Sequence, residues 1–373
     1  MYQNQYRQRL EPGVEFLVLM GIWVGCFIIG SAAAIPIWVI MTGKSVFSME
    51  KEMLNPANIN AIKMMQVVST VIVFFVPAFI TARIVSQKPF QQLGFHSGVK
   101  FNRAIAGILI MLCVIPLVGF FAEINKAIPI SASIKKVFDT LESQYADQVK
   151  LIATFKTPLD YIIALFIIAL LPAIVEEVFF RGGLQNVLLR WKNNSVFYIL
   201  LFSVLIAASY HLWFRNSMSI YVFYPVLTAI SIFVAASKKI TDFLNTYTNY
   251  PVAAILATGF IFSVIHFSWF GLIPRMVLGM VLGYIFYYSG NLWYSIIAHF
   301  FNNAFMVTIL YWQYMKDKKI DMEVGESAPW WAGLISAVIV VGLFIVLKKL
   351  SATRVASDSI AEEMRPAKDE NLT

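Results

Sequence analysis

Charged residues are scarce in this chain of 373 residues: they make up 13% of it, whereas hydrophobic residues make up 59%. A soluble globular protein has roughly 25% charged residues. One soluble core cannot enclose so many apolar side chains, so the composition excludes that class and predicts a multi-pass membrane protein. The formal net charge of +8 does not indicate nucleic-acid binding, because the Lys and Arg residues are scattered between apolar runs and form no basic face.

Cysteine is almost absent, and both cysteines, Cys26 and Cys113, lie inside apolar runs. Neither a disulfide framework nor a Cys-based metal site is therefore expected. The first apolar segment, 14–42, is longer than the ~7–15 apolar residues of a signal-peptide core. We expect it to be a spanning helix that is retained.

The chain contains many apolar runs that are long enough to cross a membrane. They predict an all-α fold, a multi-pass transmembrane helical bundle with about 8–10 spanning helices. The longest polar connection, 125–160, has a pattern suited to an amphipathic surface helix. The ten candidate spans are 14–42, 64–86, 104–125, 159–180, 196–214, 218–236, 251–270, 272–289, 291–314 and 330–347.

Lys and Arg residues gather in alternate connections, including those that follow 64–86 and 159–180. With an even number of helices both termini share a side, and this basic side is predicted to be cytoplasmic.

The stretch "LLPAIVEEVFFRGGLQ" places charge inside an apolar run. An ionisable side chain in a spanning helix costs at least ~2.5–3.5 kcal/mol on insertion scales, which makes it a functional hypothesis. Glu177 and Arg181 are four residues apart and can pair on one helix face. Glu176 points about 100° away, is the freer carboxylate and is a candidate general base. The alternative is an ion-pair cluster that orients helices, or a helix end at the interface.

Two further polar elements lie in apolar runs: His266 in "FIFSVIHFSWFG", and His299 with Asn303 in "SIIAHFFNNAF". Histidine occurs only four times in the chain. Each element alone is also explained by a hydrogen bond between helices, which is frequent in membranes. Asn302 is adjacent but lies on another helix face.

Taken together, these elements put two Glu, one Arg, two His and one Asn on three separate segments of a chain poor in such residues. A shared site for hydrolysis is the simplest interpretation, with a base, a positioned water and donors for an oxyanion. A proton-coupled transporter or a non-catalytic, immunity-type membrane scaffold are the competing hypotheses. No inverted repeat or pair of broken helices favours the transporter.

The three elements, in this order, resemble the motifs of the CPBP (CAAX protease and bacteriocin-processing, Abi) family of intramembrane proteases. The similarity covers about residues 160–310 and includes "EEVFFRGGLQ" and "PRMVLGMVLGYIFYYSGNLWYSIIAHFFNNAF". The resemblance implies an intramembrane endopeptidase that cleaves a membrane-associated protein or peptide. It implies these roles: Glu176 activates water with help from His266, Glu177 and Arg181 support that carboxylate, and His299 and Asn303 stabilise the oxyanion.

The resemblance implies no cofactor, although many family members are labelled metalloproteases. If a metal is bound, the expected ligands are Glu176, His266 and His299, with zinc as the alternative cofactor. No H-E-x-x-H is present. We also expect the bacterial cytoplasmic membrane as the location, a membrane-embedded substrate in the bilayer, and no nucleic-acid partner.

The expected organisation follows from this resemblance. Residues 1–157 form N-terminal spans and the amphipathic connection, 158–314 the catalytic helical core, 315–350 the last span, and 351–373 a polar cytoplasmic tail. About 90 residues separate Glu177 from His266, more than the family pattern has, so 193–249 is interpreted as an insertion. His211 in that insertion is interpreted as an interfacial residue.

Depth is the one difficulty for this hypothesis. Counting along the expected spans does not bring Glu176, His266 and His299 to the same level of the membrane. A fourth helix that continues toward Arg190 would place Glu176 deeper.

Overall fold

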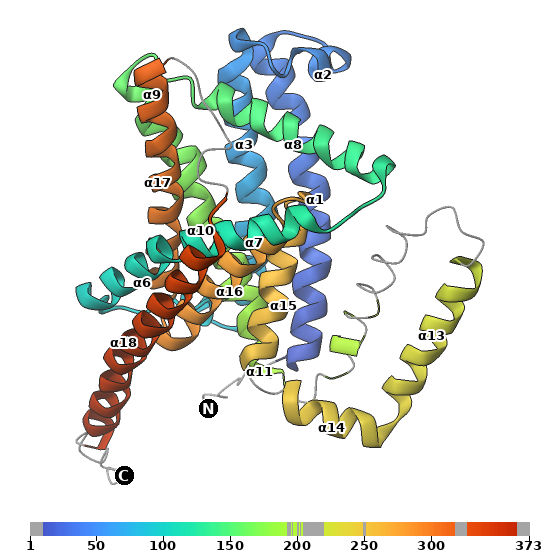
Figure 1. Ribbon diagram of the computed structural model, residues 1–373, viewed down its shortest axis with the longest axis vertical. Helices are drawn as coiled ribbons and strands as arrows, with labels where there is room; N and C mark the ends of the chain where they lie inside the picture. Colours follow the sequence, from blue (N-terminus) through green and yellow to red (C-terminus); the bar gives the residue numbers. More distant parts are fainter. Residues whose placement is uncertain are drawn as a thin grey trace, which may run out of the picture.

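The computed structural model describes residues 10–191, 195, 197–199, 201, 203, 220–248, 251–317 and 327–363. This part of the chain is helical and contains no strand (Figure 1). The all-α, multi-pass helical bundle expected from the sequence is confirmed. The helices are α1 Pro12–Thr42, α2 Met49–Glu52, α3 Ile59–Thr70, α4 Val76–Val85, α5 Pro89–Gln92, α6 Phe101–Cys113, α7 Ile115–Ala127, α8 Ala132–Ile152, α9 Pro158–Ala164, α10 Leu171–Glu177, α11 Asn186–Arg190, α13 Ile220–Ala236, α14 Lys238–Thr248, α15 Pro251–Val264, α16 Leu272–Ser289, α17 Leu292–Asp317 and α18 Trp330–Glu363.

Three π-helical stretches continue these helices without a break: η3 Val71–Phe75, η4 Leu165–Leu170 and η5 Val178–Gln185. As a result α9, η4, α10, η5 and α11 form one long span, Pro158–Arg190. The fourth span therefore does continue to Arg190. Wider turns of this kind are rare and occur often at functional sites, and here η4 and η5 lie on either side of α10.

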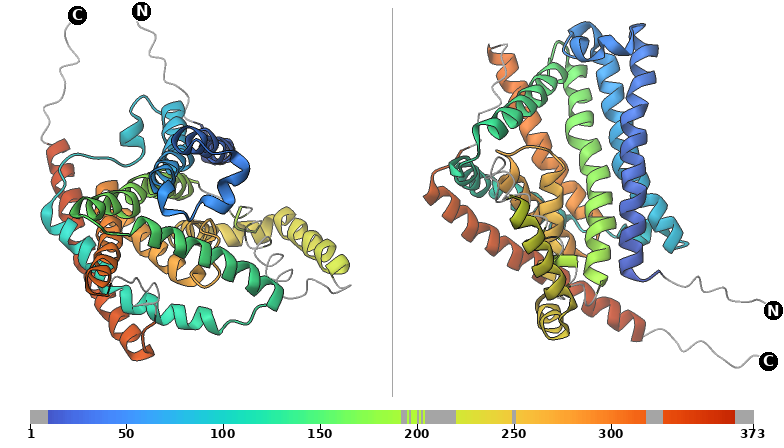
Figure 2. Two further views of the ribbon diagram at one scale, coloured as in Figure 1. Left: turned by 90° about the horizontal axis from the view of Figure 1, so that it is seen from above. Right: turned by 90° about the vertical axis from the view of Figure 1, so that its right-hand side faces the viewer.

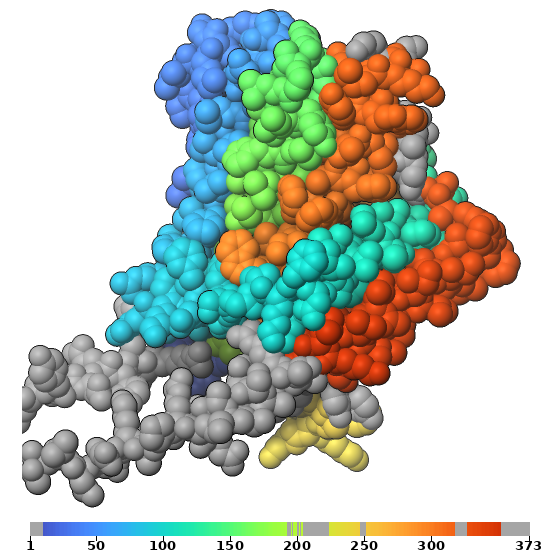
Figure 3. Space-filling model, turned by 90° about the vertical axis from the view of Figure 1, so that its left-hand side faces the viewer, coloured from blue at the N-terminus to red at the C-terminus, as the bar shows by residue number. Residues whose placement is uncertain are grey.

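Long helices stand side by side along the height of the molecule, while shorter helices and the oblique α18 fill its lower half (Figure 2). α1, the span that contains α3 and α4, and the span 158–190 run in parallel rows. In the space-filling view, the span 158–190 and α17 lie side by side, with α6, α7 and α18 crossing beneath them (Figure 3). The first turn of α1 and the C-terminal end of α18 lie at the same end of the molecule (Figure 1).

Six helices of the described residues are long and apolar enough to cross a membrane, or seven if one bent pair counts as a span. This is fewer than the ten segments expected. Segments 218–236 and 251–270 fall on α13, with 17 residues, and α15, with 14 residues. Segment 291–314 falls on α17, which has 26 residues but carries several polar side chains. Most of segment 196–214, with His211, lies outside the described residues.

The helix expected over 251–270 is shorter than its apolar sequence suggests. α15 ends at Val264, and a turn leads from there to α16. Phe267 in this turn has a φ of 50°, a left-handed conformation that is uncommon for a bulky residue. The turn is held from outside: the Asn125 side chain donates to Trp269 O at 2.8 Å and accepts from Ile273 N at 2.9 Å.

α8 confirms the amphipathic helix expected in the longest polar connection. Ile134, Val149 and Ile152 are buried, while most of its other residues are exposed. It crosses obliquely between α7 and α9, over the lower helices (Figures 1 and 2). Glu142 on this helix accepts hydrogen bonds from Ser268 Oγ at 2.6 Å and Phe270 N at 3.2 Å, so α8 also holds the α15–α16 turn.

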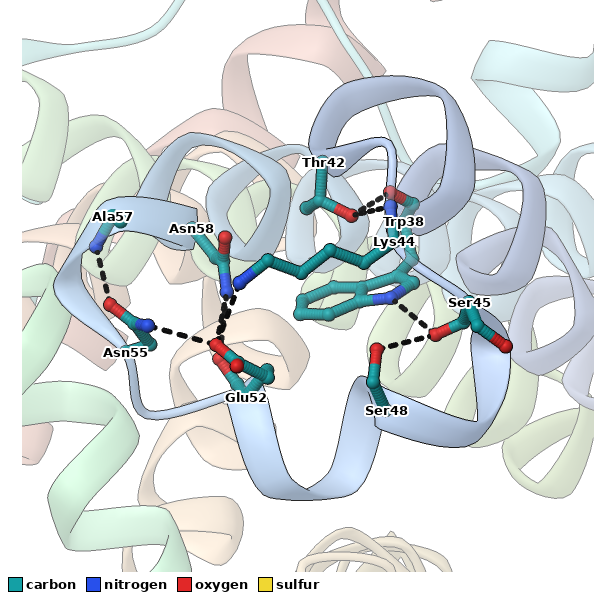
Figure 4. Close-up of polar contacts among 9 residues, drawn as sticks. All are labelled: Trp38, Thr42, Lys44, Ser45, Ser48, Glu52, Asn55, Ala57 and Asn58. Atoms are coloured by element: carbon teal, nitrogen blue, oxygen red, sulfur yellow. Dashed lines mark hydrogen bonds and ion pairs between the residues drawn. The ribbon is translucent and has the colours of Figure 1, made fainter.

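The connection between α1 and α3 closes on a compact polar cluster (Figure 4). Glu52 Oε2 accepts from Lys44 Nζ at 2.7 Å and from Asn55 Nδ2 at 2.8 Å. Asn58 Nδ2 donates to Glu52 O at 3.0 Å. Hydrogen bonds from Lys44 and Asn55 hold the pKa of the Glu52 carboxyl below its ordinary value.

Candidate functional site

The span 158–190 carries the two adjacent glutamates to different surroundings. Glu177 is fully buried, whereas Glu176 is only partly buried. Among the described residues, no hydrogen bond or salt bridge engages Glu176. The two side chains therefore have the distinct environments expected from their 100° separation on the helix.

The expected ion pair is present: Arg181 Nη1 lies 2.8 Å from Glu177 Oε1, and neither side chain is exposed. Arg181 Nη2 also donates to Gly279 O at 2.7 Å. Its guanidinium lies 5.0 Å from the ring centroid of Phe262, a favourable cation–π arrangement. Arg181 thus ties η5 to both α15 and α16.

The approach of these helices depends on glycine. A Cβ on Gly279 would lie only 2.9 Å from Gly259 Cα. A larger residue at position 279 would therefore force α15 or α16 to shift. One turn further on, Gln185 Nε2 donates to Gly283 O at 2.9 Å, and a Cβ on Gly283 would lie 2.7 Å from Gln185 Oε1. Because these glycines carry no side chain, residues of η5 can reach two backbone carbonyls of α16.

His299 on α17 joins the same cluster. Its Nδ1 lies 3.0 Å from Glu177 Oε1, and since a carboxylate accepts, Nδ1 carries the proton. Nε2 remains for another partner. The sequence interpretation has Glu177 supporting Glu176; the contacts of Glu177 seen here are with Arg181 and His299.

His266 lies in the turn just beyond α15 rather than within a helix. Its Nδ1 lies 2.7 Å from Phe262 O. A backbone carbonyl can only accept, so Nδ1 is again the protonated nitrogen. In the neutral ring Nε2 is then a hydrogen-bond acceptor and can take up a proton.

Asn303 on α17 donates through Nδ2 to Ile168 O in η4 at 3.4 Å, and its Oδ1 accepts from Asn302 Nδ2 at 3.2 Å. The first of these contacts is long for a hydrogen bond. The Asn303 amide is therefore loosely held by η4 and its neighbour.

These residues meet at one cavity of about 370 Å³. Glu176, His266, His299 and Asn303 all line it, although they come from three segments of the chain. Glu177 and Arg181 are not in its wall; they lie behind it. Counting along the expected spans did not bring these residues to the same level, but the structure does. It does so because α15 is short, with His266 just after its end, and because the fourth span is long.

Five polar lining residues belong to none of the motifs identified from the sequence: Gln66 on α3, Tyr145 and Gln148 on α8, Arg275 on α16, and Asn302 on α17. Arg275 is a lone charge in an apolar segment, the same signal that singled out Arg181, but it belongs to none of the three motifs. Tyr145, Val149 and Ile152 are spaced as on the apolar face of α8. This spacing indicates that the face is covered, but it does not indicate a cavity there.

Tyr145 exposes 57% of its surface, and the surface it exposes includes part of the cavity wall. A phenol has an ordinary pKa of about 10 and stays protonated at neutral pH. Tyr145 is therefore a neutral hydrogen-bond donor at neutral pH.

The zinc alternative requires that Glu176, His266 and His299 converge as ligands. Within the described ranges, no group of three or more His, Cys, Asp and Glu side chains is arranged to hold a metal ion. Both histidines have Nδ1 bonded to an oxygen, which leaves Nε2 as the nitrogen that a metal would use, so these contacts do not count against zinc. The three side chains nevertheless do not converge as zinc ligands in this arrangement, and metal independence stays a prediction.

Comparison with known proteins finds one family model that matches part of the chain. The model described as "Type II CAAX prenyl endopeptidase Rce1-like" matches residues 158–241 and 239–305. No curated protein and no solved structure matches the chain. The matched region begins at α9 and includes every residue of the site described above except those of α8.

Proposed function

We propose a mechanism from the premise that residues 158–305 of this integral multi-pass membrane protein belong to the CPBP family of intramembrane proteases. The family is one of peptidases, and the chain is accordingly a CAAX-type intramembrane endopeptidase in the general sense. The finer proposal is that Glu176 activates the attacking water. The observation that carries it is that Glu176, His266, His299 and Asn303 line one cavity while the neighbouring Glu177 does not.

In the first step, a water between Glu176 and His266 attacks the carbonyl carbon of the scissile peptide bond. The carboxylate of Glu176, or Nε2 of His266, takes the proton that the water loses. A new carbon–oxygen bond forms, and the carbonyl oxygen becomes an oxyanion. His266 suits this position because its Nδ1 contact leaves Nε2 as an acceptor.

In the second step, the tetrahedral intermediate collapses, the carbon–nitrogen bond breaks, and the leaving amine receives the proton held by the base. The Asn303 amide donates to the oxyanion before the collapse, and so does His299 Nε2 when both ring nitrogens carry protons. Donors of this kind are worth ~2.7–4 kcal/mol each in enzymes that cleave acyl bonds.

Glu177 and Arg181 act through His299 and are positioning residues. Their buried ion pair and the bond to Gly279 O hold η5, α16 and α17 in register. We further propose that no metal takes part, that both termini are cytoplasmic, and that the protein resides in a bacterial cytoplasmic membrane.

A comparison of membrane proteomes from cells that carry wild type or Glu176→Gln tests this proposal. The Gln side chain keeps the size of Glu but cannot take up the proton. Uncleaved precursors should accumulate in the variant, with the protein itself present at wild-type amounts. Identical sets of cleaved proteins would contradict the proposal.

A further inference from the structure

A second chamber adjoins the site. It has a volume of about 400 Å³ and shares part of its wall with the first cavity, so the two lie side by side. Its own walls come from α7, α8, α16 and α17. The shared residues are Tyr145, Val149, Ile168, Arg275, Leu278 and Asn302, together with Asn303.

Arg275 is the charged residue at this junction. Its Nη1 is buried and has no hydrogen-bond partner among the described residues, and no salt bridge in that part of the chain includes it. An arginine side chain stays charged at any pH of interest. Arg275 is half-buried, and a buried donor without an acceptor is costly. Glu176 lines the first cavity with Arg275 but forms no ion pair with it, so Nη1 is left to bind an acceptor from outside the chain.

The chain itself places the guanidinium here. Arg275 lies in the first turn of α16, and its side chain folds back over Gly271, where an added Cβ would overlap the guanidinium. The N-terminal end of α16 adds positive potential to that of the side chain. In the arrangement seen here, the guanidinium occupies the space that a side chain at position 271 would take.

The acid that shares the chamber is already engaged. Glu142 also lines it, but its Oε1 accepts from Ser268 Oγ and Phe270 N and so holds the turn. Lys126, on the α7 side, lies 3.8 Å from Glu123 Oε1. The remaining wall is mostly apolar, with Val118, Ala122 and Leu310 among its residues.

We propose that Arg275 is a specificity-determining residue, which binds a carboxylate of the substrate in this second chamber. The proposal rests on the proposed function, since it names the substrate of the same site. A guanidinium presents a planar pair of N–H donors to a carboxylate, and the neutral Tyr145 hydroxyl lies in the same shared wall. The substrate then carries an apolar segment with one carboxylate beside it, supplied either by its free C-terminus or by an acidic side chain.

Binding of three short probes to the purified Glu176→Gln protein tests this, because that variant binds without cleaving. The probes are N-octanoyl-Leu-Leu with a free carboxylate, the same compound as its C-terminal amide, and N-octanoyl-Leu-Glu amide. We expect a free-carboxylate probe to bind at least about tenfold more tightly than the Leu-Leu amide, a difference of about 1.4 kcal/mol. Preference for the first or the third probe identifies the C-terminus or the acidic side chain as the source.

The same measurement on further variants assigns the effect to Arg275. Adding Arg275→Gln should abolish the preference, and Arg275→Lys should keep part of it. Lys126→Gln removes one positive charge from the same chamber and should leave the preference unchanged. Equal binding of acid and amide, binding of none of the probes, or a preference that survives Arg275→Gln would overturn the proposal.

Failure here is distinguishable from failure of the proposed function. If precursors accumulate with Glu176→Gln but the acid preference is absent, only the role of Arg275 is wrong. If the preference is present but no precursor accumulates, the chamber binds carboxylates and the peptidase proposal is wrong.

Discussion

Two glutamates of this chain accept hydrogen bonds from a cation and a second donor, yet they stand in opposite settings. Glu52 lies in the α1–α3 connection, with 34% of its side chain exposed, and its partners are within eight residues in sequence. Glu177 is fully buried, and its contact with His299 spans 122 residues. The first cluster closes a turn, while the second fixes helices from distant parts of the chain relative to one another.

The two clusters also differ in what is left unsatisfied. Glu52 Oε2 accepts from two side chains at less than 3 Å. In the Glu177 cluster, Glu177 Oε2 and Arg181 Nε are buried and have no hydrogen-bond partner among the described residues. Such groups are costly and persist where the surrounding structure fixes them. The comparison indicates that the buried polar cluster serves to position the helices. It lies next to Glu176, the carboxylate proposed to activate water.

The largest effect should come from removing the charge of Glu177. Glu177→Gln leaves Arg181 as a buried cation without its partner, which costs about 3–5 kcal/mol in the free energy of unfolding. We expect a much lower melting temperature in detergent micelles and little accumulated protein. The matched Glu52→Gln variant should behave nearly as wild type, because water can replace its lost bonds. Equal losses in both variants would remove the distinction between the clusters.

A rate effect without a stability effect should distinguish His266 from the buried cluster. His266→Ala removes a proton acceptor from the cavity and should lower the cleavage rate by about 10²-fold or more, with an unchanged melting temperature. His299→Ala should lower both quantities, since His299 bonds to Glu177. Cleavage rates and melting curves of the two purified variants provide the check. A His266→Ala protein that unfolds as readily as His299→Ala would show that both histidines are structural.

A smaller effect is expected where α15 and α16 approach. Gly279→Ala forces a Cβ against Gly259 Cα and should cost about 1–3 kcal/mol through overpacking. Gly342→Ala in α18 is the control, since its added Cβ would meet nothing within 4 Å. Melting temperatures of both variants in detergent micelles would measure this loss of stability. A neutral Gly279→Ala would mean that the close approach does not position Arg181.

The smallest effect concerns pH at Glu52. Its folded-state pKa lies below the ordinary value of 4.5, so its contribution to stability is fully present above pH 4.5 and is lost as the pH falls through the lowered pKa. Hydrogen exchange of residues 44–58 should be slower in wild type than in Glu52→Gln at pH 7. The difference should shrink as the pH falls below 4.5 through the lowered pKa. A difference that grows on acidification would contradict this sign.

Local sequence rules were sufficient for much of this molecule. Apolar runs predicted the all-helical bundle, and a spacing of four residues predicted the Glu177–Arg181 pair. Among the described residues, fewer helices than the expected segments are long and apolar enough to cross a membrane. One reason is that hydropathy continues through "SVIHFSWFG" although α15 ends at Val264. That end depends on Asn125 and Glu142, which come from other elements.

The convergence of the site could not be predicted for the same reason. His266 and Glu176 meet because a turn held by α7 and α8 ends one helix early, and no spacing within a motif contains that information. Arg275 was missed because a lone charge is ambiguous until its surroundings are known. The motifs identified which residues belong together, while the tertiary structure shows that Glu177 contacts His299.

The central claim is that Glu176 activates the attacking water. The most direct test is cleavage, by the purified protein in lipid vesicles, of a precursor that accumulates in Glu176→Gln cells. Wild type and Glu52→Gln should cleave it at the same rate, with or without a chelator, and Glu176→Gln should be slower by about 10²-fold or more. Cleavage by Glu176→Gln at the wild-type rate would contradict the account.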